Sequence, residues 1–229
     1  MESMNNNKWC IYTSSYDRGL GHLLDIWPDV VKEVPDAQLH IFYGWELFVK
    51  FYSDNPAMMQ WKQQMDKKME YKGITNHNRV GQVEMEEWYK KCGIWAYPTH
   101  FGEISCISAM KAQAWGAVPV VIDLAALKET VKYGFKVEGD IYEEEVQELY
   151  KENLINALKN PEILNKIRPK MMKWAKEKFT WKNVAKQWDY EFKHDEMREA
   201  IETILKANPR AEQYLPIQLQ EKYELKRSY

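Results

Sequence analysis

The segment YPTHFGEISCISAMKAQAWGAVPVV, residues 97–121, has the pattern of a strand end, a turn, a helix and a second strand. Its first residue ends a short apolar run, and the proline that follows stops the strand. From Ser105 onward apolar side chains recur at helical spacing as far as Gly116, which stands where a C-cap glycine would stand. Residues 118–122 form an apolar run, as in parallel strands covered on both faces. The segment therefore predicts a β-α-β unit within a parallel sheet.

One carboxylate stands at a chemically informative place in this unit. Glu103 comes just before the predicted helix, at the carboxyl end of the predicted strand, where ligands bind in open α/β sheets. The free backbone N–H groups of Ile104, Ser105 and Cys106 would favour an anion such as a phosphate. A carboxylate beside an anion site can hold hydroxyl groups, which suits a sugar nucleotide. The alternative is an ordinary β-α-β unit in which Glu103 stabilises the helix dipole.

Size and composition limit the kinds of protein this chain can be. It has 229 residues, 45% of them hydrophobic, which is enough for a substantial core. The formal net charge of -2 gives no reason to expect nucleic acid or an anionic membrane as the main partner. Residues 1–8 are polar and no apolar run approaches the roughly 20 residues of a spanning helix, so neither a signal peptide nor a transmembrane segment is expected. The three cysteines and five histidines are scattered, and we expect a cytoplasmic protein, free or peripheral to a membrane, without a metal cluster.

Apolar patterns on both sides of the central segment extend it into a larger sheet with helices. Strands are expected at residues 9–13, 38–43, 73–77, 94–97, 118–122 and 135–137. Helices are expected at residues 20–34, 45–52, 56–71, 83–92, 105–115, 125–131 and 142–159, and from residues 161 and 181 onward. Pro28 is expected to kink or break the first helix, and Thr180 to cap the last one. Residues 194–229 alternate in charge and contain Pro209 and Pro216, so they predict a packed or partner-binding helical appendage rather than a basic membrane anchor.

The central segment resembles the donor-site signature of the GT-B-type retaining glycosyltransferases of the group 1 or family 4 class. That signature is a Glu, a few small residues, a second Glu eight positions on, and a helix that ends in Gly before an apolar strand. Glu103 matches the first Glu, but Lys111 stands at the second. The other matching residues are Ala112, Gly116, Pro119 and Val120. In the family the first Glu faces the donor sugar and the second holds the ribose hydroxyls. Lys111 is therefore expected to reach the nucleotide as a donor or cation, or to weaken donor binding.

The loop after the first strand has two interpretations. The sequence Gly19-Leu20-Gly21 followed by Leu24 is close to the G-x-G-x-x-G dinucleotide fingerprint, and Glu46 stands roughly where the ribose-binding acid would stand. Leu24, however, is too bulky for the close helix–strand packing that the third glycine provides. This interpretation predicts a nicotinamide-dependent oxidoreductase.

The second interpretation comes from the same family resemblance. Arg18 and Gly19 resemble the Lys-Gly or Arg-Gly pair that opens the donor domain, whose cation faces the donor diphosphate. The family often has an earlier Arg in this loop, where the present chain has Thr13, Ser14 and Ser15. One positive charge is thus missing, and Ser14 and Ser15 are left as candidate donor contacts. The alternative for Arg18 is a solvated loop residue.

The resemblance covers about residues 9–193 and implies a fold. This is an α/β fold with a Rossmann-like parallel sheet and helices on both faces, which is one half of a GT-B fold, plus a C-terminal helical appendage. The implied nucleotide-sugar-binding domain is 8–193 and the helical tail is 194–229. Val80 and Gly81 resemble the family's G-x-V loop, whose backbone meets the nucleotide base.

The resemblance also implies a reaction. A sugar would pass from a nucleotide-sugar to a hydroxyl of a glycan or another acceptor, with retention and without a bound metal. Arg18 and the amides of Ile104 to Cys106 would stabilise the leaving diphosphate while Glu103 positions the sugar. No acceptor-binding domain is visible in the sequence, so such a domain is expected outside this chain. Two alternatives stay open, a non-catalytic sugar-nucleotide-binding or interaction domain and the NAD-dependent oxidoreductase.

Overall fold

The computed structural model describes residues 5–207. The chain divides into two compact units, one up to Lys176 and one from Glu177 onward. The first unit contains the whole sheet. The described part of the second unit is mainly one long helix, α9 (Trp181–Ala207). Within residues 5–207 no helix is both long enough and apolar enough to cross a membrane.

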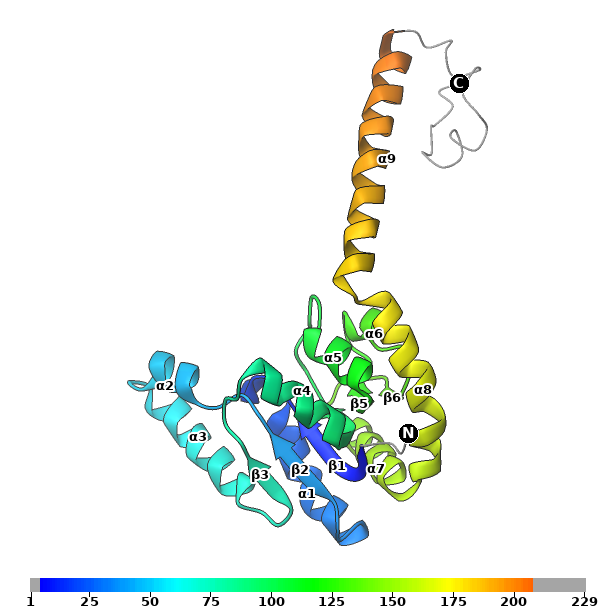
Figure 1. Ribbon diagram of the computed structural model, residues 1–229. Coiled ribbons are helices and arrows are strands. Elements are labelled where there is room, and N and C mark those ends of the chain that lie inside the picture. Colours follow the sequence, from blue (N-terminus) through cyan, green and yellow to red (C-terminus); the bar gives the residue numbers. More distant parts are fainter. Residues whose placement is uncertain (1–4, 208–229) are drawn as a thin grey trace. The chain divides into compact units, whose positions relative to one another are not determined.

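The first unit is built on a six-stranded sheet in which every neighbouring pair is parallel (Figure 1). The strands are β1 (Asn6–Tyr12), β2 (Gln38–Ile41), β3 (Ile74–Asn76), β4 (Cys92–Tyr97), β5 (Val118–Ile122) and β6 (Phe135–Val137). Their order is β3-β2-β1-β4-β5-β6. The chain therefore builds outward from β1 to β3, returns to the middle and builds outward again from β4 to β6. The order reverses between β1 and β4, and ligands bind outside the carboxyl ends of strands at such a point.

Helices cover both faces of the sheet. α1 (Leu20–Glu33), α3 (Pro56–Met69) and α7 (Glu144–Lys159) pack together on one face, while α4 (Gln82–Lys91) and α5 (Ile107–Trp115) pack together on the other (Figure 1). The remaining helices are η1 (Tyr16–Arg18), α2 (Glu46–Tyr52), α6 (Leu127–Thr130) and α8 (Pro161–Lys178). This doubly wound arrangement confirms the predicted Rossmann-like α/β fold.

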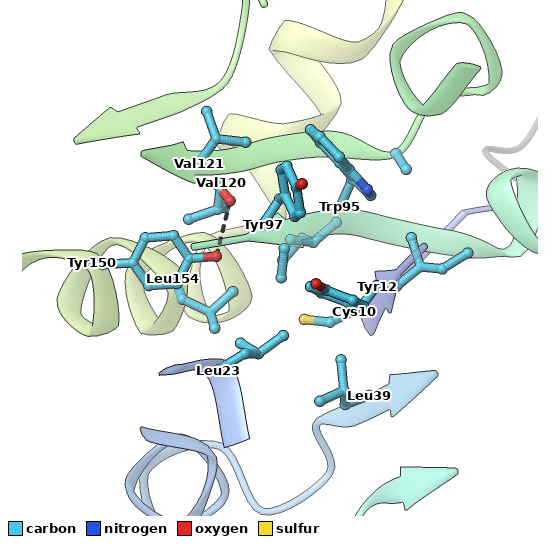
Figure 2. Packing of buried hydrophobic residues seen from close by; sticks show 14 of the residues in the cluster. Cys10, Tyr12, Leu23, Leu39, Trp95, Tyr97, Val120, Val121, Tyr150 and Leu154 are labelled. Carbon is cyan, nitrogen blue, oxygen red and sulfur yellow. Dashed lines mark hydrogen bonds between the residues drawn. The ribbon is translucent and has the colours of Figure 1, made fainter. Parts of the chain in front are cut away.

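The core lies between the sheet and these helices. Every residue of β4 and of β5 is buried, as expected for central parallel strands that read as apolar runs. Figure 2 shows the packing of this cluster, in which the Tyr150 hydroxyl of α7 donates a hydrogen bond of 2.9 Å to the Val120 carbonyl oxygen of β5. The hydroxyl of this fully buried tyrosine is thus paired with a neighbouring element.

Two predicted helix details differ from the structure. α1 continues through Pro28 and ends only at Glu33, because its buried face packs on both sides of the proline. α5 begins at Ile107 with Cys106 as its N-cap residue, so the helix starts two residues later than predicted. In the second unit, Thr180 caps α9 as predicted, since its hydroxyl accepts a bond of 3.4 Å from the Asn183 N–H.

The tail prediction meets the structure only in part. The expected boundary at residue 193 lies inside α9, which runs unbroken to Ala207. Pro209 and Pro216, which were expected to interrupt the helical tail, lie outside the described residues. The division into a donor domain 8–193 and a tail 194–229 therefore stays a prediction.

Candidate functional site

The loops that follow β1 and β4 touch each other at Gly19. This residue has a φ of 117° and lies between η1 and α1. A Cβ atom here would lie 2.3 Å from the Pro98 carbonyl oxygen, so a glycine is required by both conformation and space. The close approach brings Arg18, the residue before this glycine, against the loop that carries Glu103.

Arg18 and Glu103 form the centre of the candidate site. Arg18 Nη1 lies 3.4 Å from Glu103 Oε1. The Tyr97 hydroxyl donates a hydrogen bond of 2.7 Å to the same oxygen, and Ser14 Oγ lies 3.2 Å from that hydroxyl. The Arg18 guanidinium also lies over the Phe101 ring, 4.0 Å from its centroid. These five side chains come from two loops and one strand end, and we call them the Arg18–Glu103 cluster.

Burial fixes Glu103 more firmly than Arg18. The Glu103 side chain is 10% exposed, whereas the Arg18 side chain is 36% exposed. Burial raises the pKa of the Tyr97 hydroxyl well above its ordinary value, and the neighbouring Glu103 carboxylate raises it further. Tyr97 therefore stays protonated and keeps donating to Glu103. Among the described residues none donates a hydrogen bond to the second oxygen of Glu103, Oε2.

The start of α5 supplies backbone N–H groups beside the cluster. The predicted anion-binding residues Ile104, Ser105 and Cys106 directly precede the first helical residue, Ile107, and the N–H groups of the first helical turn have no partner within the helix. These three residues form the loop between Glu103 and the helix, and Ile104 is 97% exposed. Burial raises the pKa of the Cys106 thiol to about 11, so this cysteine is neutral near pH 7.

A cavity of about 300 Å³ opens where β1, β2, α4 and α5 meet. Its walls include the aromatic side chains of Phe42, Tyr43 and Tyr89 and the cations of Arg79 and Lys111. Gln82, Thr13 and Ser108 add polar groups. We call it the aromatic cavity. It adjoins the Arg18–Glu103 cluster through the chain itself, because Thr13 lines the cavity and the next residue, Ser14, belongs to the cluster.

Five of the eleven residues predicted from the sequence fall into these two neighbouring groups. Arg18, Glu103 and Ser14 lie in the cluster, and Val80 and Lys111 line the cavity. Two other predicted residues, Ser15 and Gly81, have roles in the local backbone structure. The Ser15 carbonyl oxygen accepts bonds from the Tyr12 hydroxyl at 2.7 Å and from the Arg18 N–H at 3.0 Å. Gly81 is the N-cap residue of α4, and a Cβ there would meet open space.

Sequence reasoning missed several side chains of the site. Tyr97 reads as the last apolar residue of a buried strand, and Phe101 reads as a turn residue. Tyr97 had one usable signal, which is a polar tip at the carboxyl end of a central strand. Arg79 directly precedes the predicted Val80–Gly81 contacts, and no motif in the sequence distinguishes it. Nothing in the sequence singles out Gln82. Its place in the site follows from its contact with Lys111, whose Nζ donates to Gln82 Oε1 at 2.5 Å.

Comparison with known proteins places this fold. No protein-family model and no curated protein sequence matches the chain. Among solved structures, the sucrose-phosphate synthase of Thermosynechococcus elongatus is similar with a TM-score of 0.65 at 15% identity, over 81% of this chain and 45% of its own. HepE of Anabaena, solved with UDP and glucose, gives 0.64 at 15%, over 82% and 49%. The pneumococcal O-GlcNAc transferase GtfA, solved with UDP and GlcNAc, gives 0.60 at 13%, over 85% and 38%.

These similarities define the class of fold. The chain has the fold of one half of a GT-B glycosyltransferase, and the predicted resemblance to the GT-B class is confirmed. The chain spans less than half the length of each of these three structures.

Proposed function

We propose that this chain is the donor-binding part of a glycosyltransferase. It would hold a nucleotide-sugar whose sugar passes to an acceptor hydroxyl with retention at the anomeric carbon and without a metal cofactor. The observation that carries the proposal is the Arg18–Glu103 pair, which lies at the carboxyl ends of two neighbouring parallel strands beside the aromatic cavity. Aromatic walls suit a nucleotide base, a cation suits a diphosphate, and a fixed carboxylate suits sugar hydroxyls.

The chemistry follows from this division of the site. When the bond between sugar and diphosphate breaks, negative charge grows on the diphosphate oxygens. Arg18 and the amides at the start of α5 stabilise that charge in place, which lowers the barrier. Glu103 is held by Tyr97 through one oxygen and presents the other, Oε2, to the sugar. In this proposal Tyr97 is a positioning residue, because it acts through Glu103.

The solved neighbours support the proposal without identifying the donor. GtfA was solved with UDP and GlcNAc, and HepE with UDP and glucose, so both bind a uridine nucleotide together with a sugar. A glycan or another hydroxyl compound is the proposed acceptor. An acceptor-binding domain outside the present chain completes the proposed enzyme, because this chain corresponds to less than half of those structures.

The dinucleotide alternative receives little support from the loop after β1. Gly21 is a helical residue of α1, and a Cβ there would meet only the Met65 sulfur at 3.8 Å, an ordinary contact. Leu24, at the third glycine position, is buried. Only Gly19 makes a close approach, and the second and third glycine positions lack the close approaches on which dinucleotide binding depends.

Titration calorimetry of the full chain with UDP, GDP, ADP and NADH tests the proposal. We expect one nucleoside diphosphate to bind. Arg18→Ala should weaken its binding by about tenfold or more, since a charge-assisted hydrogen bond to phosphate is lost. Arg198→Ala is the matched control, because Arg198 pairs only with Glu202 on α9 among the described residues. Equal binding to wild type and Arg18→Ala would contradict the proposal. Binding of NADH alone would favour the oxidoreductase.

A further inference from the structure

The aromatic cavity has an unusual balance of charge. Two of its lining residues, Arg79 and Lys111, are cations, and none of its lining residues is an acid. Among the described residues neither cation forms an ion pair. The Lys111 ammonium donates only to the neutral side-chain oxygen of Gln82, at 2.5 Å. The cavity therefore carries two positive charges that no carboxylate balances.

Some other lysines of the same unit behave differently. Lys151 pairs with both Asp29 and Glu148, and Lys136 pairs with Asp123 at 2.8 Å. The lysines of this unit therefore differ, since Lys136 and Lys151 have acidic partners, while Lys128 forms no ion pair among the described residues, as is true of Lys111. Two like charges left without a partner around one concave space repel each other, and an anion bound between them would relieve that repulsion.

The wall next to these cations suits a planar ring. Phe42, Tyr43 and Tyr89 all line the cavity, but Phe42 and Tyr89 are buried. Tyr43 is 41% exposed, so its ring is the one that can stack on a nucleotide base. Tyr43 has a φ of 137° and Asn78, just before Arg79, a φ of 57°, and the two are joined by a bond of 3.1 Å from the Tyr43 N–H to the Asn78 carbonyl. Non-glycine residues in this region are strained and often occur at binding sites.

The position of the cations decides which phosphate they would hold. In the proposed function the 5′-diphosphate lies against Arg18 and the first residues of α5, Ile107 and Ser108, at the edge of the aromatic cavity, while base and ribose enter the cavity. Lys111 lies one helical turn further along α5, so it faces the ribose side of the ligand. A ribose with free hydroxyls is gripped by a carboxylate, whereas a ribose phosphate is gripped by cations. Lys111 and Arg79 supply the second chemistry and not the first.

We propose that the aromatic cavity takes a nucleotide whose ribose carries a phosphate, at the 2′ or the 3′ oxygen, held by Lys111 and Arg79. This inference rests on the proposed function and specifies its donor. Lys111 then makes the site selective for this ligand and does not weaken its binding. Gln82 keeps the Lys111 ammonium at the cavity until the phosphate replaces it.

Binding of paired nucleotides tests the inference. The 2′,5′- and 3′,5′-bisphosphates of adenosine, uridine and guanosine are titrated into the full chain beside ADP, UDP and GDP, so that each pair carries two phosphates. For one base we expect a bisphosphate to bind at least about tenfold more tightly than the diphosphate. Lys111→Glu should reverse this preference, and Arg79→Gln should reduce it.

Controls separate the possible outcomes. Lys128→Glu on α6 makes the same change of net charge away from the cavity lining, and should leave the preference unchanged. Diphosphates that bind wild type as tightly as bisphosphates would overturn the inference while the proposed function stands. A preference that survives in Lys111→Glu would overturn it as well, because the phosphate would then lie elsewhere. A chain that binds neither class would contradict both the inference and the proposed function.

Discussion

The Pro98 carbonyl oxygen lies 2.3 Å from the point where a Cβ would stand on Gly19. These two residues belong to the loops after β1 and β4, and their approach sets the distance between Arg18 and Glu103. Gly21, only two positions further on, has room for a Cβ. The two glycines of this loop therefore have different roles, although they look alike in the sequence.

Gly19→Ala is expected to destabilise the protein by on the order of 1–3 kcal/mol, because a side chain at a φ of 117° is strained and would displace Pro98. Gly21→Ala should be neutral or stabilising by up to about 1 kcal/mol, since it removes a helical glycine. Urea denaturation followed by circular dichroism measures both. Equal stability of the two variants would show that the loops can separate without cost.

Glu103→Gln is expected to weaken the binding of a nucleotide-sugar by about tenfold, because the carboxylate faces the sugar and not the diphosphate. The affinity for the matching nucleoside diphosphate should stay within about twofold of wild type. Calorimetry with UDP and UDP-glucose, or with the pair for whichever base binds, gives both values. A parallel loss for both ligands would place Glu103 at the diphosphate instead.

Tyr97→Phe is expected to weaken the binding of the nucleotide-sugar more than that of the nucleoside diphosphate. The reason is that Glu103 loses the hydroxyl that donates a hydrogen bond to it at 2.7 Å. Tyr150→Phe removes a hydroxyl bond of 2.9 Å to the Val120 carbonyl oxygen, so it is a matched control for stability. Both should cost about 1 kcal/mol of unfolding free energy. Only Tyr97→Phe should change nucleotide-sugar binding, and an equal effect of both would reduce Tyr97 to a structural residue.

Arg168→Leu is expected to destabilise the first unit by on the order of 3 kcal/mol, because buried acceptors lose their donor. Arg168 is buried, and its Nε donates to the Gly116 carbonyl oxygen at 2.8 Å while Nη1 donates to Asn165 Oδ1 at 2.7 Å. Burial lowers its pKa to about 10, which still leaves it charged near neutrality. Urea denaturation checks this, with the exposed Arg198→Ala expected within about 0.5 kcal/mol of wild type.

Acid is expected to weaken the fold through His40. Burial, with smaller contributions from His77 and Lys91, lowers the pKa of His40 to about 4, whereas the unfolded chain has an ordinary value near 6.5. The unfolded state then binds a proton that the folded state does not. The contribution of His40 to the free energy of unfolding is therefore complete above about pH 6.5. It is lost as the pH falls toward 4, at no more than about 1.4 kcal/mol per pH unit.

His40→Phe isolates that contribution. It keeps an aromatic ring near Trp9 and Trp88, whose centroids lie 4.8 Å and 4.7 Å from that of His40, but it cannot take up a proton. The unfolding free energy of this variant should depend less on pH between about 6.5 and 4 than that of wild type. Identical pH profiles would show that His40 is not the group that titrates.

The sequence was informative where local pattern and burial agree. Central strands β4 and β5 are covered on both faces, so their apolar runs indicated them directly. The start of α5 was predicted too early, because the helical spacing of apolar residues is already present from Ser105 while the helix begins at Ile107. Periodicity alone does not fix the first residue of a helix to better than a few positions.

The site was predictable only where a family pattern named its residues. Arg18 and Glu103 are far apart along the chain, and no spacing rule joins them. The partnership of Tyr97 with Glu103 depends on how the loop after β4 turns back, and that of Lys111 with Gln82 depends on how α4 packs against α5. Contacts of this kind follow from tertiary structure and leave no periodic signal.

The reversal of strand order between β1 and β4 has a consequence for folding. Arg18 comes from the half of the sheet built by β1 to β3, and Glu103 from the half built by β4 to β6. Neither half contains a whole site, so the site exists only after the two halves have joined. A bound donor would bridge them and oppose their separation, which makes ligand affinity a reporter of complete assembly of the domain.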